Sequence, residues 1–259
     1  MSLNRTRLRY SGAEDVDFSF YGGFPIDFPT GIGGMDCTIG TIRCADGIGT
    51  EIQLTTVPER LISISGYVTG IPGEEYRRML ERAFAPTSAG RLWAETEAHE
   101  RFYLDCISTS APTIQGARQR PRFQVNLTAA YPYWQRDAER EIRLEAANGA
   151  EDFDAVIVSD VPAPYSLTIS SAAGCQGAAI SIGAQELRYT GAIPAGKTLA
   201  IAIAPSGRIS ADLDGTDVIG RVSGALRKLE PGAQRIHLDI PAGSGVSAKI
   251  IYREGRAGV

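Results

Sequence analysis

The sequence predicts a mainly β protein with a single α-helix, arranged in two domains. An N-terminal β-barrel-like or sandwich-like domain that carries the helix is expected to precede a C-terminal β-sandwich of the jelly-roll type. Three observations lead to this prediction. Apolar and polar residues alternate with a period of two in many short runs, as in half-buried strands. Only one stretch has convincing helical periodicity. Beyond residue 150, about eight strand patterns recur at spacings of about 8–12 residues, which is typical of a sandwich.

The stretch Leu61–Trp134 organises the first domain. It begins with a strand pattern in which Ile62, Ile64 and Val68 share one face and serines fill the other. A helix is predicted over Glu74–Ala85, because apolar residues recur there at the spacing of one helical stripe. The residues of this stripe are Tyr76, Met79, Leu80, Ala83 and Phe84.

The period of two returns after the helix. A hairpin is predicted from the arms Arg91–Glu97 and Arg101–Ile107, with its turn at Ala98 and His99. The next predicted strand is Arg122–Thr128, which alternates strictly. An isolated helix of about 12 residues is marginal in water. We therefore expect the apolar stripe of the helix to lie against a sheet formed by these strands.

Two further segments of the first domain are predicted to lie at its surface. Tyr21–Gly34 is rich in glycine, proline and aromatic residues, which excludes a helix. It is interpreted either as a loop that caps the core or as an arm that packs on a neighbouring subunit. Ala111–Pro121 is predicted to be an exposed excursion, and long loops of this kind are often contact surfaces. Thr50–Val57, between the two segments, is predicted to be a strand.

The composition changes after Trp134. Gln135–Leu144 is dense in charge, and Glu145–Ala150 is interpreted as a linker. We therefore predict one domain over residues 1–145 and a second over residues 146–259.

The second domain is predicted to contain short strands separated by turns, with no helix of useful length. Asp214 and Gly215 separate two alternating runs, and this dipeptide is a strong signal for a tight hairpin turn. The predicted strands are Tyr165–Ser170, Ala178–Ile182, Glu186–Thr190, Thr198–Ile203, Arg208–Leu213, Thr216–Val222, Arg235–Ile240 and Val246–Arg253.

The bulk composition excludes several classes of protein. A net charge of −4 argues against a general nucleic-acid-binding protein, which needs a concentrated basic face. The four cysteines lack metal-type spacing, so we expect free, buried thiols from a reducing compartment. Met1–Tyr10 lacks the apolar core of a signal peptide. No apolar run approaches the roughly 20 residues that span a bilayer, so no membrane insertion is expected.

No catalytic, cofactor-binding or metal-binding residues are predicted, and the protein is not expected to be an enzyme. The only two histidines are His99, at a hairpin tip, and His237, on the polar face of a strand. A carboxylate–histidine metal site at His99 would lack a second histidine, so a solvated turn is the preferred interpretation. Asp212–Asp217 has an incomplete calcium-loop pattern, which a hairpin turn explains equally well.

The order of these elements resembles that of the distal tail proteins (Dit) of long-tailed, siphovirus-type bacteriophages and prophages. The resemblance covers nearly the whole chain. Its markers are the strand-turn-helix of Ile62–Phe84, the hairpin of Gly90–Cys106, the closing strand and aromatic cluster of Phe123–Trp134, and the turns at Ile193–Lys197 and Leu229–Gly232. Tyr21–Gly34 is a departure that has no match in the family.

This resemblance implies a structural protein of the virion without catalysis. The N-terminal domains would form a ring, usually hexameric, that joins the tail tube protein to the tail hub or tail-tip protein. The C-terminal galectin-like sandwiches would project outward and, in some phages, carry receptor-binding proteins. Assembly would take place in the bacterial host cytoplasm. Aromatic residues suit such interfaces, and the candidate subunit-interface residues are Phe24, Phe28, Trp93, Tyr131, Tyr133 and Trp134.

Two other functions compete with this interpretation. The jelly-roll pattern also suits a carbohydrate-binding protein that acts in recognition of the host surface. The second domain is poor in aromatic residues for stacking on sugar rings, with only Phe153, Tyr165, Tyr189 and Tyr252. An enzyme such as a glycosidase is the other alternative, because its two carboxylates need not be neighbours in sequence.

Overall fold

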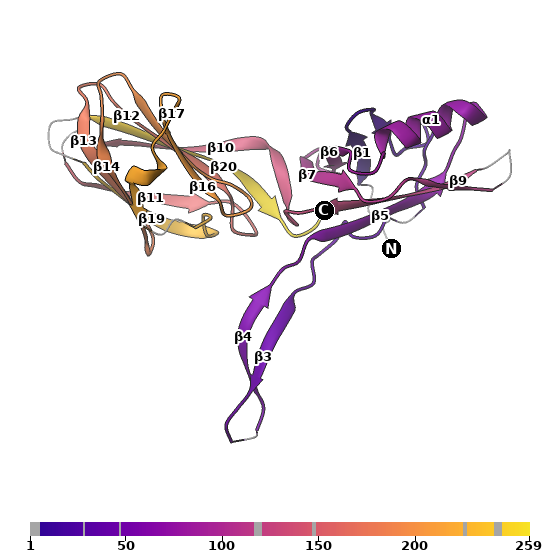
Figure 1. Ribbon diagram of the computed structural model, residues 1–259, viewed down its shortest axis with the longest axis horizontal. Coiled ribbons are helices and arrows are strands. Elements are labelled where there is room, and N and C mark those ends of the chain that lie inside the picture. The colour runs from indigo at the N-terminus through magenta and orange to yellow at the C-terminus, as the bar shows by residue number, and fades with distance from the viewer. Residues whose placement is uncertain are drawn as a thin grey trace. The chain divides into compact units, whose positions relative to one another are not determined.

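The structure is a computed structural model that describes residues 6–27, 29–46, 48–116, 121–146, 149–224, 227–240 and 245–259 (Figure 1). The chain divides into two compact units: unit 1 comprises Met1–Asp137 together with Arg256–Val259, and unit 2 comprises Ala138–Gly255. The described residues are mainly β with one α-helix, which confirms the predicted fold class. No helix in the described ranges has the length and apolar character needed to cross a membrane. The predicted boundary at residues 145/146 falls at the end of a strand.

The strands of unit 1, apart from one separate hairpin, form an antiparallel sheet. β6 and β7 are the predicted hairpin, and β1 pairs with the outer side of β6. The end of β9 pairs with β7, and β9 pairs along its whole length with β5. The strands are β1 (Arg7–Ser11), β2 (Val16–Asp17), β5 (Arg60–Tyr67), β6 (Ala89–Glu95), β7 (Arg101–Ser108), β8 (Thr113–Gln115), β9 (Arg122–Ala129) and the start of β10 (Trp134–Ala146).

The predicted strand and helix together build the core of unit 1. Ile62 and Ile64 on β5 are buried, and their neighbours along the strand are exposed or half-buried, as the alternation predicts. The buried residues of helix α1 (Gly73–Ala83) belong to the predicted stripe: Tyr76, Leu80 and Ala83. Phe84 follows the helix, and its ring centre lies 4.5 Å from that of Tyr10 on β1. The helix therefore covers the sheet as expected.

The glycine- and proline-rich segment Tyr21–Gly34 lies along one edge of β5. Thr30 and Ser63 exchange two backbone hydrogen bonds of 2.9 and 3.2 Å. Phe24 belongs to the core cluster of unit 1 and has no exposed surface. These contacts support the interpretation as a loop that caps the core, because the segment satisfies backbone groups at a strand edge. Phe28 lies outside the described residues.

A separate two-stranded hairpin follows this segment. It consists of β3 (Thr38–Arg43) and β4 (Thr50–Thr56), which pair only with each other (Figure 1). Every residue of both strands is exposed. The register shifts between Gly40 and Thr41, where Gln53 is the extra residue of a β-bulge. β4 is a predicted strand, whereas β3 is not among the predictions.

Unit 2 is a sandwich of two antiparallel sheets. In one the strand order is β17-β16-β15-β12-β20-β10, and in the other it is β11-β19-β13-β14-β18. Leu167 and Ile201 from the first sheet and Ile180 and Leu238 from the second belong to one core cluster. The strands are β11 (Glu151–Ile157), β12 (Tyr165–Ser171), β13 (Cys175–Ile182), β14 (Gln185–Ile193), β15 (Thr198–Ile203), β16 (Ile209–Leu213), β17 (Thr216–Asp217), β18 (Val222–Gly224), β19 (Gly232–Asp239) and β20 (Val246–Arg256).

The turn predictions for unit 2 are confirmed at one site and corrected at another. Asp214 and Gly215 join β16 to β17 with φ values of 53° and 88°, as a tight hairpin turn requires. The predicted strand over 216–222 is wrong, because β17 ends at Asp217 and a 3-10 helix spans Ile219–Arg221. The side chain of Asp217 accepts a 2.9 Å hydrogen bond from the Ile219 N–H, which favours a turn over an extended strand.

The four cysteines are free thiols in three kinds of environment, and Cys44 is only half-buried. Cys106 and Cys175 are buried, as predicted, and burial raises the pKa of the Cys106 thiol to about 12. Cys37 is exposed, so the expectation of burial is wrong for this residue. It immediately precedes the exposed strand β3, where no core covers the chain.

Candidate functional site

Both histidines lie in pairs with single carboxylates at the surface. His99 is at the tip of the β6–β7 hairpin, with Nδ1 3.0 Å from Oε1 of Glu95. Nδ1 of His237 lies 2.9 Å from Oδ1 of Asp152, and Oδ2 of the same carboxylate accepts a 2.7 Å hydrogen bond from Arg235. Within the described ranges, no group of three or more His, Cys, Asp or Glu residues is arranged to hold a metal ion.

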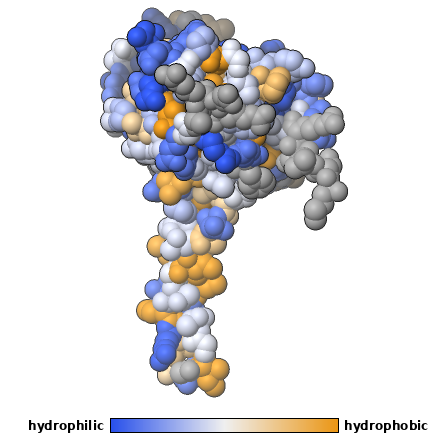
Figure 2. Space-filling model, turned by 90° about the vertical axis from the view of Figure 1, so that its right-hand side faces the viewer, coloured by the Kyte–Doolittle hydropathy of each residue, from blue (hydrophilic) through white to orange (hydrophobic). Residues whose placement is uncertain are grey.

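The hairpin β3–β4 exposes apolar side chains on both of its faces. Residues paired directly across two strands share a face, so the register places Ile39 and Ile52 on one side and Ile42 and Leu54 on the other. Their exposed fractions are between 50% and 62%. Figure 2 shows apolar side chains along the length of this hairpin. Contiguous exposed apolar surface of this kind marks an interaction site.

Arg60, the first residue of β5, joins the chain that follows the hairpin to Gly31 and Gly33, which precede it. The Arg60 side chain is only 1% exposed, and its guanidinium donates hydrogen bonds to four carbonyl oxygens. Nε donates to Pro132 at 2.5 Å, Nη1 donates to Gly31 at 2.6 Å and to Gly33 at 2.7 Å, and Nη2 donates to Ala257. Burial lowers the pKa of Arg60 to about 10, so the group remains charged at neutral pH. The carbonyl dipoles take the place of water around this buried cation.

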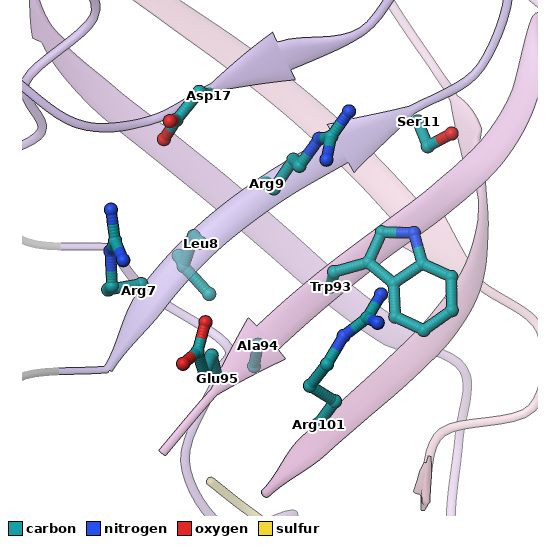
Figure 3. A pocket seen from close by; sticks show the side chains of 9 residues that line it. All are labelled: Arg7, Leu8, Arg9, Ser11, Asp17, Trp93, Ala94, Glu95 and Arg101. Carbon is teal, nitrogen blue, oxygen red and sulfur yellow. The ribbon is translucent and has the colours of Figure 1, made fainter. Parts of the chain in front are cut away.

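A surface groove of about 490 Å³ lies over β1 and β6, with Arg101 from β7 at its edge (Figure 3). Trp93 is its aromatic residue, and Arg9 on β1 lies directly opposite Trp93 in the register. The Arg101 guanidinium lies 4.8 Å from the centre of the Trp93 ring. The Tyr103 ring is tilted against the Trp93 ring, with the two ring centres 5.3 Å apart. Arginine around half-buried aromatic rings is typical of protein interfaces.

The six residues predicted for subunit interfaces lie in three kinds of environment. Two are in the core of unit 1 (Phe24 and Trp134), three are half-buried and reach the surface (Trp93, Tyr131 and Tyr133), and Phe28 is outside the described residues. The Trp134 indole N–H donates a 3.1 Å hydrogen bond to the carbonyl of Ile32 inside the unit. Phe24 and Trp134 therefore offer no contact area to a second subunit in this conformation.

Sequence reasoning missed both the hairpin β3–β4 and the role of Arg60, although the sequence holds a signal for each. Asp46-Gly47 between two alternating runs is a hairpin signal of the same kind as the confirmed turn in unit 2. Arg60 is in phase with Ile62 and Ile64, so the period of two places it on the buried face of β5.

The aromatic residues of unit 2 do not form a platform for sugar stacking. Tyr165, Tyr189 and Tyr252 are buried in the sandwich core, and Phe153 is partly buried against it. A lectin site that stacks sugar rings needs exposed aromatic faces. This arrangement weighs against the carbohydrate-binding alternative.

Comparison with solved structures shows that the chain shares its fold with phage proteins over nearly its whole length. The Dit (gp 19.1) protein of phage SPP1, described as a paradigm of the hub adsorption apparatus in phages that infect Gram-positive bacteria, matches with a TM-score of 0.71 and 12% sequence identity. The match covers 97% of this chain and 99% of that one. A chain of the phage P2 baseplate in its activated conformation with Ca matches with a TM-score of 0.54, 11% identity, and coverage of 98% and 99%. The sequence matches no family model and no curated protein.

Proposed function

We propose that the protein is a structural component of the adsorption apparatus of a phage tail. In this role it forms a closed ring, of hexameric type, between the tail tube protein and the tail hub protein. The observation that carries the proposal is the fold likeness to the SPP1 Dit protein over 97% of the chain. The role requires contact surfaces rather than a catalytic group, and unit 1 has such surfaces.

In the proposed ring, the hairpin β3–β4 binds a neighbouring copy of the chain. A two-stranded hairpin without other packing is marginally stable in water. Because this hairpin exposes Ile39 and Ile52 on one face and Ile42 and Leu54 on the other, a partner that covers both faces would stabilise it. Head-to-tail contacts between identical subunits close into rings when the rotation between them is suitable.

The other contacts of the proposed ring involve the half-buried aromatic residues that reach the surface of unit 1. Trp93 in its arginine-lined groove is the strongest of these, because tryptophan and arginine often dominate interface energies. Tyr131 and Tyr133 form an edge-to-face pair with ring centres 5.5 Å apart. We propose that these two surfaces contact a neighbouring subunit, the tail tube protein or the hub protein. Unit 2 would carry any receptor-binding protein, and the assembly would be completed in the bacterial host cytoplasm.

The oligomeric state of the purified full chain tests this proposal. Native mass spectrometry and negative-stain electron microscopy should show a closed ring in equilibrium with protomers. Ile52→Asp combined with Leu54→Asp places one charge on each hairpin face and should leave only protomers. The matched control is Val156→Asp combined with Val158→Asp, which changes two exposed valines of unit 2 and should leave the ring intact.

The folded state of the variants must be checked, because assembly is the only intended change. The hairpin residues belong to neither core cluster. The protomers of both double variants should therefore unfold at the same temperature as the wild-type protomer. A wild-type chain that stays monomeric at high concentration, and also when mixed with the tube and hub proteins of its own phage, would contradict the proposal.

A further inference from the structure

The segment Arg256–Val259, here called the return segment, packs as part of unit 1. It follows the whole of unit 2 in sequence, yet it belongs to unit 1. The carbonyl of Ala257 accepts a hydrogen bond from the buried guanidinium of Arg60. The backbone N–H of Val259 donates a 3.3 Å hydrogen bond to the carbonyl of Ile32. The segment is therefore bound through its backbone at two points.

The first residue of the return segment adds a side-chain anchor. Nη2 of Arg256 lies 3.0 Å from Oε2 of Glu100, and its guanidinium lies 4.4 Å from the centre of the Phe102 ring. The side chain of Val259, at the other end, packs against the core cluster of unit 1. A cation and an apolar side chain thus flank the two backbone contacts, which is how a protein recognises a short peptide.

The residue between these contacts has to be small. An ideal Cβ on Gly258 would lie 2.7 Å from the carbonyl carbon of Gly33 and 2.9 Å from the amide nitrogen of Gly34. Both atoms belong to the backbone, so no side-chain rotation would relieve the overlap. An ideal Cβ on Gly34, in contrast, would meet no atom within 4 Å. The close approach of the Gly33–Gly34 backbone therefore requires glycine at position 258.

We propose that unit 1 contains a peptide-binding groove whose ligand is the return segment, with the pattern Arg-small-Gly-apolar. When the groove is filled, the carbonyl of Ala257 completes the set of hydrogen-bond acceptors around Arg60. Arg60 begins the strand that follows the hairpin β3–β4. With the groove empty, a buried N–H of the Arg60 guanidinium loses its partner, and such a loss is destabilising. The groove thus fixes the base of the hairpin through a segment from the far end of the sequence.

A shortened chain that ends at residue 255 tests the groove directly. Both tryptophans of the protein lie in unit 1, so their fluorescence reports the unfolding of this unit. The shortened chain should unfold at a lower temperature than the full chain. A synthetic peptide with the sequence of residues 254–259 should bind saturably and raise the unfolding temperature back towards that of the full chain. The same peptide with Gly258→Ala, or with Arg256→Glu, should restore much less.

Full-length variants keep the proposal testable if the shortened chain fails to fold. Gly258→Ala should speed the amide hydrogen exchange of Val259 and Arg60 by about tenfold or more, because the segment leaves the groove more often. Gly34→Ala is the matched control and should leave these rates unchanged. Equal exchange rates in the two variants would overturn the proposal. A folded shortened chain with an unchanged unfolding temperature, or without peptide binding, would do so as well. Neither measurement depends on ring formation, so the proposed function can fail or hold separately.

Discussion

The guanidinium of Arg101 on β7 lies over the ring of Trp93 on β6, 4.8 Å from the ring centre. Arg91 lies over the neighbouring Tyr103 ring at 4.2 Å, and Arg91 also forms a 2.7 Å ion pair with Asp105. Cations and aromatic rings therefore alternate across this face of unit 1. Replacing a single ring should disturb several contacts at once.

Trp93→Ala should destabilise unit 1 by about 1–2 kcal/mol. The variant removes the Tyr103 ring contact at 5.3 Å and the contacts of Trp93 with the two arginines. Urea unfolding followed by circular dichroism measures the change. Trp93→Phe keeps an aromatic ring and should recover at least half of the loss. An unfolding midpoint that is unchanged in the alanine variant would show that these contacts are too solvated to contribute.

Arg60→Met should destabilise unit 1 by about 3 kcal/mol, because buried carbonyl oxygens lose charged donors. The free energy of unfolding is measured with urea, using the fluorescence of the two tryptophans of unit 1. Arg60→Lys keeps the charge but lacks the planar fork that reaches several carbonyls, so an intermediate loss is expected. A methionine variant as stable as the wild type would show that well-packed apolar volume replaces the hydrogen bonds fully.

Asp152 should make the stability of unit 2 depend on pH in the acid range. Hydrogen bonds from Arg235, and then from His237, lower the pKa of Asp152 to about 2, whereas the unfolded chain should titrate near the ordinary value of about 3.9. The stabilising contribution is therefore present above about pH 4 and is lost as the pH falls towards 2. Carboxyl NMR titration measures the pKa directly. The urea midpoints of the wild type and Asp152→Asn should differ at pH 5 and converge below pH 2, and parallel midpoints over the whole range would contradict the assignment.

The thiols should react with alkylating reagents in a fixed order. Cys37 is exposed and should react first, whereas Cys106 is buried and its pKa is raised to about 12, so little thiolate exists at pH 8. Mass spectrometry after timed iodoacetamide treatment gives the order. Modification of Cys106 should require unfolding in urea. Rapid labelling of Cys106 in the native protein would mean that unit 1 opens frequently around β7.

The elements that were predicted correctly are those in which the local sequence pattern agrees with the burial in the structure. The alternation around Ile62 and Ile64, the helical stripe around Leu80, and the Asp214-Gly215 turn each specify one local structure, and each is confirmed. In these places the residues that the pattern marks as buried do face the core. The order of elements that resembles the Dit family also agrees with the fold likeness to the SPP1 protein.

The features that escaped prediction depend on partners that are distant in sequence. β3 escaped prediction because it lacks a buried face, and its pairing with the predicted strand β4 is not visible in a local pattern. Arg60 contacts carbonyls at residues 31, 33, 132 and 257, and no local pattern reports such a set. β11 (Glu151–Ile157) was missed because its charged residues face solvent at the edge of a sheet. Phe24 and Trp134 are two of the six predicted interface residues. Their location in the core likewise follows from tertiary packing.

The placement of Arg256–Val259 in unit 1 makes unit 2 an insertion with its entry and exit side by side. β10 enters unit 2 and β20 leaves it, the two are neighbours in one sheet, and Glu139 and Arg253 form a 2.8 Å ion pair across them. Insertions whose ends lie close together are the ones that evolution and protein engineers exchange most easily. A short turn from Asp137 to Arg256 could therefore replace the whole sandwich, and a foreign domain with adjacent termini could be grafted at the same junction, leaving unit 1 as a reusable scaffold.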